Sequence, residues 1–339
     1  MTSLSRLPLL PALLLLLAAA MTASLALGRY PLPPFEVARF FLAWAGLAEL
    51  PPERMGLLHN LIVEIRLPRV LAAVLVGASL SVSGAAYQAV FRNPLVSPGL
   101  LGVLAGAASG AALGMVFSGN WWVMQAAAFA MGALAVIVGV GIGALFGNSV
   151  VMLVLGGIIS GSLFTAILSM VKYVADPYNQ LPAIVYWLMG SLASADLKDL
   201  LRLAFPMTFG ILVLSSLGRA LDALSMGDDE ARALGVPVTA VRYGVIAAAT
   251  LVSALTVSLA GMIGWVGLLV PHVARLLVGP GNARLLPASA CLGAVFLLVA
   301  DGIARNIGTT EIPIGIVTEL LGIPAFLLVL HRARRGWVT

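Results

Sequence analysis

The sequence predicts an all-α, polytopic membrane protein in which about ten transmembrane helices form a tightly packed bundle. Hydrophobic residues make up 61% of the 339 residues and charged residues only 10%, whereas an ordinary soluble domain carries about 25% charged residues. No charged residue lies between Arg92 and Lys172, a length that accommodates about three spans of about 20 residues each. This composition disfavours a soluble enzyme, a disordered chain and a secreted disulfide scaffold.

Apolar runs bounded by turn residues place the individual spans. Backbone groups in lipid must be hydrogen-bonded within their own segment, so spans of this composition are expected to be helices. Ten runs occur, at approximately 7–28, 70–91, 95–118, 121–146, 150–171, 200–218, 243–263, 265–279, 285–302 and 312–331. Residues 183–195 are too short to span and predict a re-entrant or interfacial helix. The chain, 1–339, is therefore interpreted as a single transmembrane domain.

The two ends of the chain bear on topology. The leucine-rich run after Arg6 resembles a secretory signal, but nine further spans favour an uncleaved first helix. Ten spans place both termini on one side of the membrane, and the arginines of 332–335 fit a cytoplasmic C-terminus. Charge counting alone does not settle the orientation, because segment 29–69 makes the outer side nearly as basic.

Small residues recur inside the predicted spans. The chain has 36 glycines, and regularly spaced examples are Gly102, Gly106 and Gly110, then Gly139, Gly141 and Gly143. Small side chains let helices approach closely where no hydrophobic force drives them together. The pattern predicts close helix packing, and the single cysteine, Cys291, is interpreted as a packing residue.

Motifs for covalent chemistry are missing from the sequence. There is no G-x-x-x-x-G-K-[ST] phosphate-binding loop, and His59, His272 and His331 lack metal-ligand spacing. We expect this chain to be no enzyme, to bind no metal or cofactor, and to contact lipid but not nucleic acid, because its basic residues are scattered singly. Glu319 is an exception inside the last span, where a carboxylate marks a functional site by default; a hydrogen-bonded packing role is the alternative.

Residues 219–242 form the densest charge cluster and separate the sixth span from the seventh. Leu221, Leu224, Ala231 and Leu234 have roughly helical spacing, while residues 228–230 are acidic. An acidic residue at 228 or 229 suits a helix start, and Gly235 followed by Pro237 is a stop signal. The segment predicts a short amphipathic helix of the kind that docks into a groove on another protein.

Several motifs together resemble the FecCD-type permeases, the membrane subunits of type II ABC importers for ferric siderophores, haem and cobalamin. The segment G-D-x-x-A-x-x-L-G resembles their ATPase-coupling helix. Further resemblance lies in the segments 66–102, 187–191 (WLMGS), 260–279, 285–305 and 311–330. The resemblance covers nearly everything after about residue 60. It implies a cobalamin-permease-like fold with ten helices and both termini cytoplasmic.

The resemblance also assigns roles to single residues. The coupling insert lies within 219–242, and its contact residues are Gly227, Asp228, Glu230, Ala231, Arg232, Leu234 and Gly235. Docking of a substrate-binding protein is assigned to Arg66, Arg69 and Arg305. The translocation pathway is assigned to Ser160, Ser162, Thr165 and Glu319, and a cytoplasmic gate to Asn148 and Ser149. Glu319 departs from the small residue expected at its position.

The resemblance implies a permease for a metal chelate in a bacterial or archaeal cytoplasmic (inner) membrane. A ferric siderophore or haem is the favoured cargo, and a corrinoid such as vitamin B12 or an oxyanion such as molybdate is the alternative within the family. The partners are a second copy of the chain or a close relative, two ATPase subunits that carry ATP and Mg, and a periplasmic or lipid-anchored binding protein. Among other classes, an ion-driven secondary transporter is the main alternative, because Glu319 is the one residue that would serve it.

Overall fold

A computed structural model describes residues 9–147 and 149–336, which form helices joined by short connections. The elements follow the chain in this order: α1 (Leu9–Ala26), α2 (Pro34–Trp44), α3 (Pro52–His59), the π-helical turn η1 (Asn60–Arg66), α4 (Leu67–Val90), the 3₁₀ turn η2 (Pro98–Leu101), α5 (Val103–Phe117), α6 (Trp121–Leu145), α7 (Val150–Val174), α8 (Gln180–Leu188), α9 (Leu197–Ser216), α10 (Gly218–Met226), α11 (Asp228–Ala233), α12 (Val238–Ala260), α13 (Val266–Val278), α14 (Asn282–Asn306) and α15 (Ile314–Gly336).

The predicted spans agree with these helices. Each of the ten predicted runs overlaps a helix, in chain order α1, α4, α5, α6, α7, α9, α12, α13, α14 and α15. Among the described residues, six helices are long and apolar enough to cross a membrane, and the bent pair α9–α10 is a seventh candidate. α5, α13 and the apolar part of α15 are shorter. The all-helical membrane fold is therefore confirmed.

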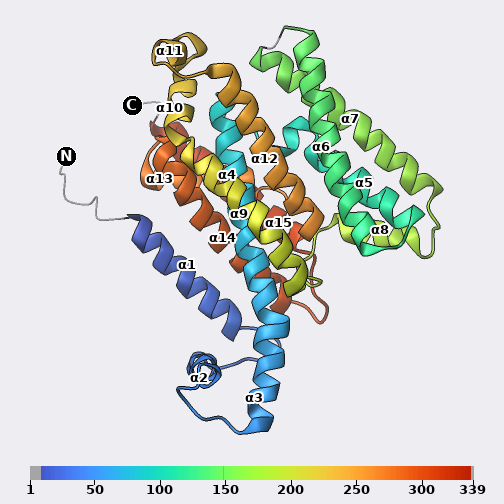
Figure 1. Ribbon diagram of the computed structural model, residues 1–339, viewed down its shortest axis with the longest axis vertical. Helices are drawn as coiled ribbons and strands as arrows, with labels where there is room; N and C mark the ends of the chain where they lie inside the picture. The colour runs from blue at the N-terminus through green and yellow to red at the C-terminus, as the bar shows by residue number, and fades with distance from the viewer. Residues whose placement is uncertain (1–8, 148, 337–339) are drawn as a thin grey trace, which may run out of the picture.

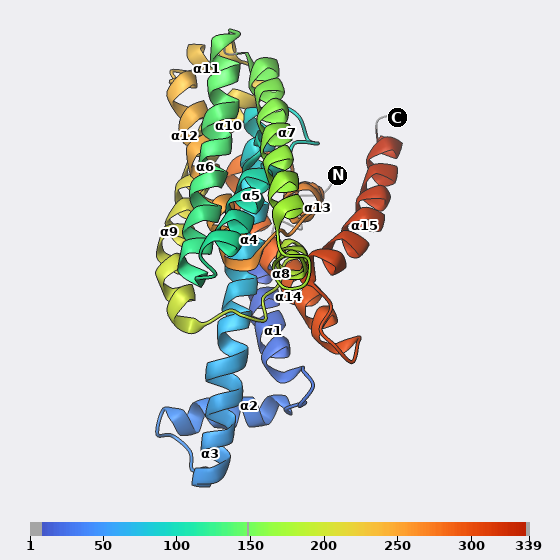
Figure 2. The same cartoon turned by 90° about the vertical axis from the view of Figure 1, so that its right-hand side faces the viewer.

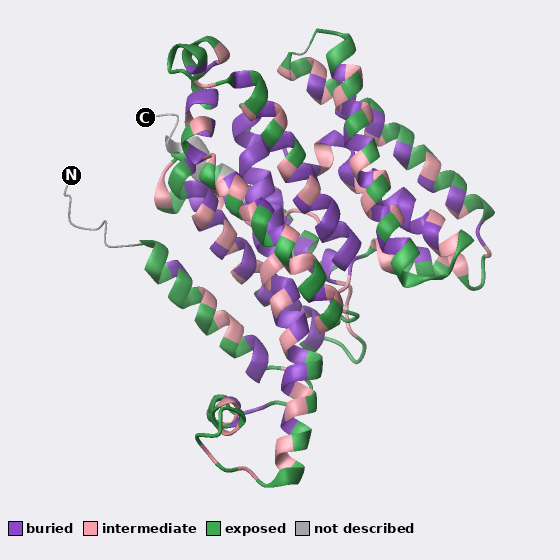
Figure 3. Cartoon of the chain, in the orientation of Figure 1, coloured by how far each residue is buried: buried purple, intermediate pink, exposed green. Residues whose placement is uncertain are grey.

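α4 is the central helix of the bundle (Figure 1). It packs against α9, α12, α13 and α14, and it is buried along nearly its whole length (Figure 3). α1 and α7, by contrast, present much of their surface to the outside. The sequence of α4 explains its position, because glycine, alanine and serine dominate its middle and allow neighbouring helices to come close.

Glycines make the closest helix contacts, as predicted. A Cβ at Gly77 would overlap the carbonyl of Gly293 on α14, and one at Gly84 would overlap the carbonyl of Gly267 on α13. Gly106 and Gly110 bring α5 against α6 in the same way. Gly141 is the exception, since nothing lies within 4 Å of its added Cβ.

These contacts predict opposite effects for two alanine substitutions. Gly84→Ala is expected to lower the free energy of unfolding by about 1–3 kcal/mol, because α4 and α13 must separate to admit the methyl group. Gly141→Ala is the matched control and should leave stability unchanged or raise it by up to about 1 kcal/mol. Thermal unfolding of the two purified variants measures the difference, and equal stabilities would contradict the packing described here.

The predicted starts of α5 and α4 were wrong, whereas the predicted break between α12 and α13 was correct to within three residues. α5 begins at Val103 instead of 95, because Pro98 and the left-handed Gly102 (φ 82°) interrupt the run. α12 and α13 are separated by an unwound stretch from Gly261 to Trp265, the latter also left-handed (φ 68°). At the other extreme, α3, η1 and α4 form one continuous helical stretch of 39 residues. At 1.5 Å per residue it is about 58 Å long, well beyond the hydrocarbon core of a bilayer.

The two ends of the molecule differ. α10 and α11 lie at one end, toward which α15 runs, and α2 and α3 project from the opposite end (Figure 2). Residues 183–195 form no span: α8 ends at Leu188 and a loop follows. Within 219–242, the predicted short helix that starts at residue 228 or 229 and stops at Gly235 is α11, and Gly227 (φ 148°) separates it from a further helix, α10.

Candidate translocation pathway and coupling segment

The coupling segment is a short helix held between two glycines. A Cβ at Gly227 would overlap the Glu230 carboxylate, which folds back over the start of α11. At the other end Gly235 is left-handed (φ 79°), and its N–H donates to the carbonyl of Arg232 while the N–H of Val236 donates to that of Ala231. These two hydrogen bonds form a Schellman motif at the C-terminal end of the helix, which explains why glycine occupies position 235.

The side chains of α11 divide into an anchored set and a free set. Ala231 is fully buried, and Asp228 is half-buried. Leu234 is 64% exposed, and Asp229 and Arg232 pair with each other at the surface, 2.7 Å apart. The free set gives α11 an exposed leucine within a charged rim, which suits contact with another protein.

Asp228 ties α11 to the bundle. Its carboxylate accepts hydrogen bonds from Arg242 at 2.6 and 2.8 Å and from Arg92 at 3.2 Å. Arg242 is in the first turns of α12, and Arg92 follows the end of α4. The hydrogen bond and charge of Arg242, with the charges of Arg92 and Arg232, lower the pKa of Asp228 below its usual value. The bridge is therefore present above that pKa and is lost only as the pH falls through it, so it is intact at neutral pH.

A groove on α7 is the candidate pathway. It has a volume of about 530 Å³ and is formed by one face of α7 together with η2. Its lining residues, all uncharged, are Gly99, Leu100, Gly157, Ile158, Gly161, Ser162, Thr165, Ala166 and Ser169. The three hydroxyls donate to carbonyls four residues earlier on α7, which leaves their oxygens free to accept hydrogen bonds from a solute.

The structure brings together only part of the predicted pathway. Ser162 and Thr165 line the groove, but Ser160 is fully buried and donates to the carbonyl of Ala135 at 2.6 Å. Ser160 thus joins α7 to α6 and faces away from the groove, which contradicts its assignment to the lining. Glu319 is exposed on α15 beside the unwound stretch before α13, where a Cβ at Gly264 would lie 3.7 Å from its Oε1.

The WLMGS segment, residues 187–191, lies between the end of α12 and the start of α15. The N–H of Ser191 donates to Ala260 at the end of α12, and the N–H groups of Ile314 and Gly315 donate to Gly190 and Met189. Added Cβ atoms at Gly190 and Gly315 would overlap neighbouring carbonyls. These bonds connect the start of α15, and with it Glu319, to the end of α12.

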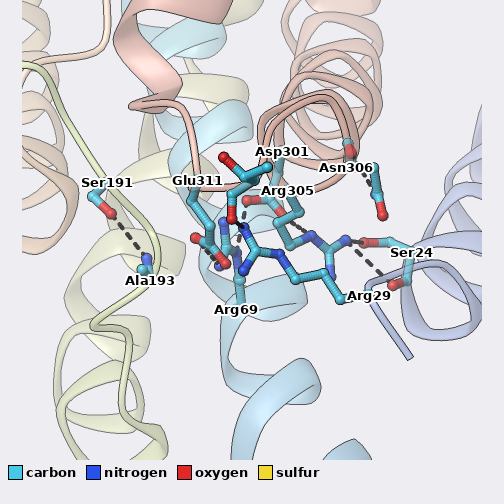
Figure 4. Close-up of polar contacts among 11 residues, drawn as sticks. Ser24, Arg29, Arg69, Ser191, Ala193, Asp301, Arg305, Asn306 and Glu311 are labelled. Atoms are coloured by element: carbon cyan, nitrogen blue, oxygen red, sulfur yellow. Dashed lines mark hydrogen bonds and ion pairs between the residues drawn. The ribbon is translucent and has the colours of Figure 1, made fainter. Parts of the chain in front are cut away.

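A buried ionic network lies at the N-terminal end of α4 (Figure 4). Arg69 donates to Asp301 and to Glu311, each at 2.8 Å. Asp301 is fully buried and its other oxygen lies 3.0 Å from Arg305. Arg305 also donates to the Ser24 hydroxyl at 2.8 Å. The network joins α1, α4, α14 and the loop before α15.

The three arginines predicted to dock a binding protein belong to this buried region. Arg66, Arg69 and Arg305 are only 4%, 9% and 6% exposed. Arg66 donates to the carbonyls of Leu25, Ala26 and Tyr30 and so caps the end of α1. Their guanidinium groups are already bonded within the chain, which argues against the docking assignment.

The predicted gate falls partly outside the described residues. Asn148 lies outside them, and Ser149 caps α7 by accepting a hydrogen bond from the N–H of Met152 at 3.2 Å. Over residues 9–147 and 149–336, no three His, Cys, Asp or Glu side chains gather where they could hold a metal ion. His272 packs against Phe326 and bonds to the carbonyl of Leu268.

Sequence reasoning missed several residues of these sites. Ser169 follows Thr165 by four residues, so helical periodicity could have identified it. Asp301 and Arg305 have the i,i+4 spacing of a helical ion pair, but the pairs of Arg92 with Asp228 and of Asp301 with Arg69 gave no such signal, because the partners lie 136 and 232 residues apart in the chain. Only the folded structure shows those pairs.

Comparisons with known proteins agree with the motif resemblance. The model of the FecCD transport family matches residues 15–332. The molybdate import system permease protein MolB of Haemophilus influenzae is 37% identical over 331 residues, which cover 96% of this chain and 95% of that protein. A Helicobacter pylori protein named "Probable iron chelatin transport system permease protein" is 40% identical over 283 residues, 83% of this chain and 86% of that protein.

A solved structure is also similar. It is an inward-facing conformation of a transporter of the metal-chelate ABC type, with a TM-score of 0.84 and 36% sequence identity. The match covers 96% of this chain and 99% of that chain.

Proposed function

The chain belongs to the FecCD transport family and is a permease subunit of an ABC importer, and from this premise we propose that its cargo is a metal chelate, with a ferric siderophore or haem favoured. The observation that carries the proposal is the groove on α7. Its lining of glycine and hydroxyl-bearing residues has no fixed charge, and hydroxyl oxygens can accept hydrogen bonds from a bulky solute without holding it tightly. Such a surface suits a cargo that moves along the groove better than a cargo that is bound tightly in it.

The proposed assembly contains a second copy of the chain. The groove is open and lies on a face of α7 that the subunit leaves largely exposed. Two such faces, apposed across a dimer axis with Glu319 of α15 nearby, would form one pathway between the subunits. Two ATPase subunits that hold ATP and Mg would bind α11, which places α11 and both termini in the cytoplasm of a bacterial or archaeal cell. On this proposal the chain itself performs no covalent chemistry and needs no cofactor.

A substrate-binding protein would dock at the opposite end, where α2 and α3 project. Arg29 and Arg39 are exposed there and replace the buried Arg66, Arg69 and Arg305 as the basic groups that a partner's carboxylates would meet. Such contacts steer association and weaken with salt.

Molybdate is the second candidate cargo. A relative named for molybdate import matches nearly the full length of this chain. The exposed carboxylate of Glu319 weighs against it, because an oxyanion would be repelled at close range. A corrinoid remains the further alternative within the family.

Uptake by the reconstituted complex tests the cargo. Proteoliposomes containing the permease, its ATPase and its binding protein are given iron-55 ferric hydroxamate, haem, cyanocobalamin or molybdate, with and without ATP inside. We expect ATP to raise accumulation of the ferric chelate or haem at least tenfold. ATP-dependent accumulation of molybdate alone would reject the chelate proposal and support the second candidate.

A further inference from the structure

The bridge at Asp228 leads along the chain from the coupling helix to the wall of the pathway. We propose that Asp228 is a positioning residue that transmits the movement of α11 through Arg92 to η2, so that the ATPase moves the groove wall directly. This inference rests on the proposed function, since it takes α11 as the contact for the ATPase. Three structural links carry it.

The first link is the ionic bridge itself. Asp228 lies in the first turn of α11, and it bonds at the same time to Arg92 beyond α4 and to Arg242 at the start of α12. Arg242 is 7% exposed, so one side of the bridge is fixed in the bundle. Arg92, at the surface, is the side that continues toward the groove.

The conformation of Arg92 is the second, independent observation. Arg92 is left-handed (φ 49°), a conformation that L-residues other than glycine adopt rarely. Its N–H donates to Ala89, and that of Asn93 donates to Gln88, which is the helix ending where glycine normally stands. An arginine kept in a strained position indicates that its side chain has a function there, and the bridge to Asp228 supplies one.

The third link is the short segment from Arg92 to η2. Asn93 folds it into turns, because its carbonyl accepts from the N–H of Val96 and its side chain accepts from that of Leu95. Val96 is 2% exposed and anchors the turn. A further bond joins the N–H of Leu100 to the carbonyl of Ser97. The segment is bonded along its length and can pass a displacement on.

η2 then meets the pathway helix without intervening side chains. A Cβ at Gly157 on α7 would lie 2.6 Å from the carbonyl oxygen of Leu100, and one at Gly102 would lie 3.0 Å from the N of Gly161. Gly99 and Leu100 themselves line the groove. Movement of η2 therefore changes the width of the groove or moves α7.

Distance measurements in the assembled complex test the proposal. Cys291, the only cysteine, is replaced by alanine, and spin labels are placed at either Ala233→Cys on α11 or Leu100→Cys in η2. The distance between the labels on the two protomers is measured before and after the ATPase is trapped with ATP and vanadate. The measurement is made in the parent and in three variants, Arg92→Gly, Arg92→Gln and Arg92→Lys. Arg284→Gln, an exposed arginine at the start of α14, is the control.

We expect trapping to shift both distances in the parent and in the control. In Arg92→Gly and Arg92→Gln the distance change between the labels at position 233 should persist, while the distance change at position 100 should fall at least fivefold. Arg92→Lys should restore most of the distance change at position 100. Glycine fits the left-handed position, so the melting temperature of Arg92→Gly should not fall below that of the parent. If Arg92 had a purely structural role, the distance change at position 100 on trapping would be the same in Arg92→Gly as in the parent. Parent-like shifts at both positions in the glycine and glutamine variants would overturn the inference. Absence of any shift at 233 in the parent would contradict the proposed function instead.

Discussion

Asp301→Asn is expected to lower the free energy of unfolding by about 3–5 kcal/mol, the loss typical when one member of a buried ion pair is removed. Asp301 is fully buried and bonds to Arg69 at 2.8 Å with Arg305 3.0 Å away. The neutral amide would leave two buried arginines with Glu311 as the remaining carboxylate of the network. Because the network joins α1, α4 and α14, the variant should also lose transport.

The measurement is thermal unfolding of the purified permease, with Asp199→Asn as the matched control. Asp199 forms a looser pair with the exposed Arg202, 3.6 Å apart, and its loss should cost at most about 1 kcal/mol. If Asp301→Asn is as stable as the control but no longer responds to the binding protein, the network serves docking after all, as the motif resemblance implies.

Leu234→Asp should weaken binding of the ATPase 10- to 100-fold and reduce ATP-driven uptake accordingly. Leu234 is 64% exposed beside α11 in the isolated chain, and burying a leucine at an interface contributes about 1.5–3 kcal/mol. An aspartate there forfeits that burial and must also be desolvated. The permease itself should fold normally, because the side chain makes few contacts within it.

Leu234→Met tests whether an apolar side chain of similar size is sufficient at this position, or whether leucine itself is required. It preserves most of the buried area and should bind the ATPase within about threefold of the parent. Co-purification and titration of the ATPase onto detergent-solubilised permease give the affinities. Parent-like binding by Leu234→Asp would remove this residue from the coupling interface.

Composition and periodicity were sufficient for the membrane-spanning helices but not for their breaks. Lipid imposes a length and an apolar composition on each span, so α6, α7 and α12 could be placed within a few residues. The start of α5 depends on left-handed backbone at Gly102 and was missed, whereas the start of α13, beside the left-handed Trp265, was placed within one residue. The helices α2 and α3 were missed because they are short and mixed in composition.

In the candidate sites too, features set by the local sequence were predictable, whereas features set by distant partners were not. Local geometry was predictable in α11, since glycines at 227 and 235 bound a short helix and need no distant partner. The buried position of Arg69 was not predictable, because Asp301 and Glu311, which hold it, lie far along the chain. Ser160 lies on the same helix as the groove residues but faces α6, a difference in rotation that the motif alone does not resolve.

In the proposed function, an ATPase supplies the energy for uptake through α11; an ion-driven transporter is the alternative class. Vesicles are prepared with the permease and its binding protein, either without or with the ATPase, and ATP and ion gradients are varied independently while uptake of ferric hydroxamate, haem, cyanocobalamin and molybdate is recorded. We expect accumulation only when the ATPase and ATP are both present, with no change when ionophores collapse the gradients. Uphill accumulation of any of these solutes by vesicles lacking the ATPase, abolished by an ionophore, would contradict the proposed function.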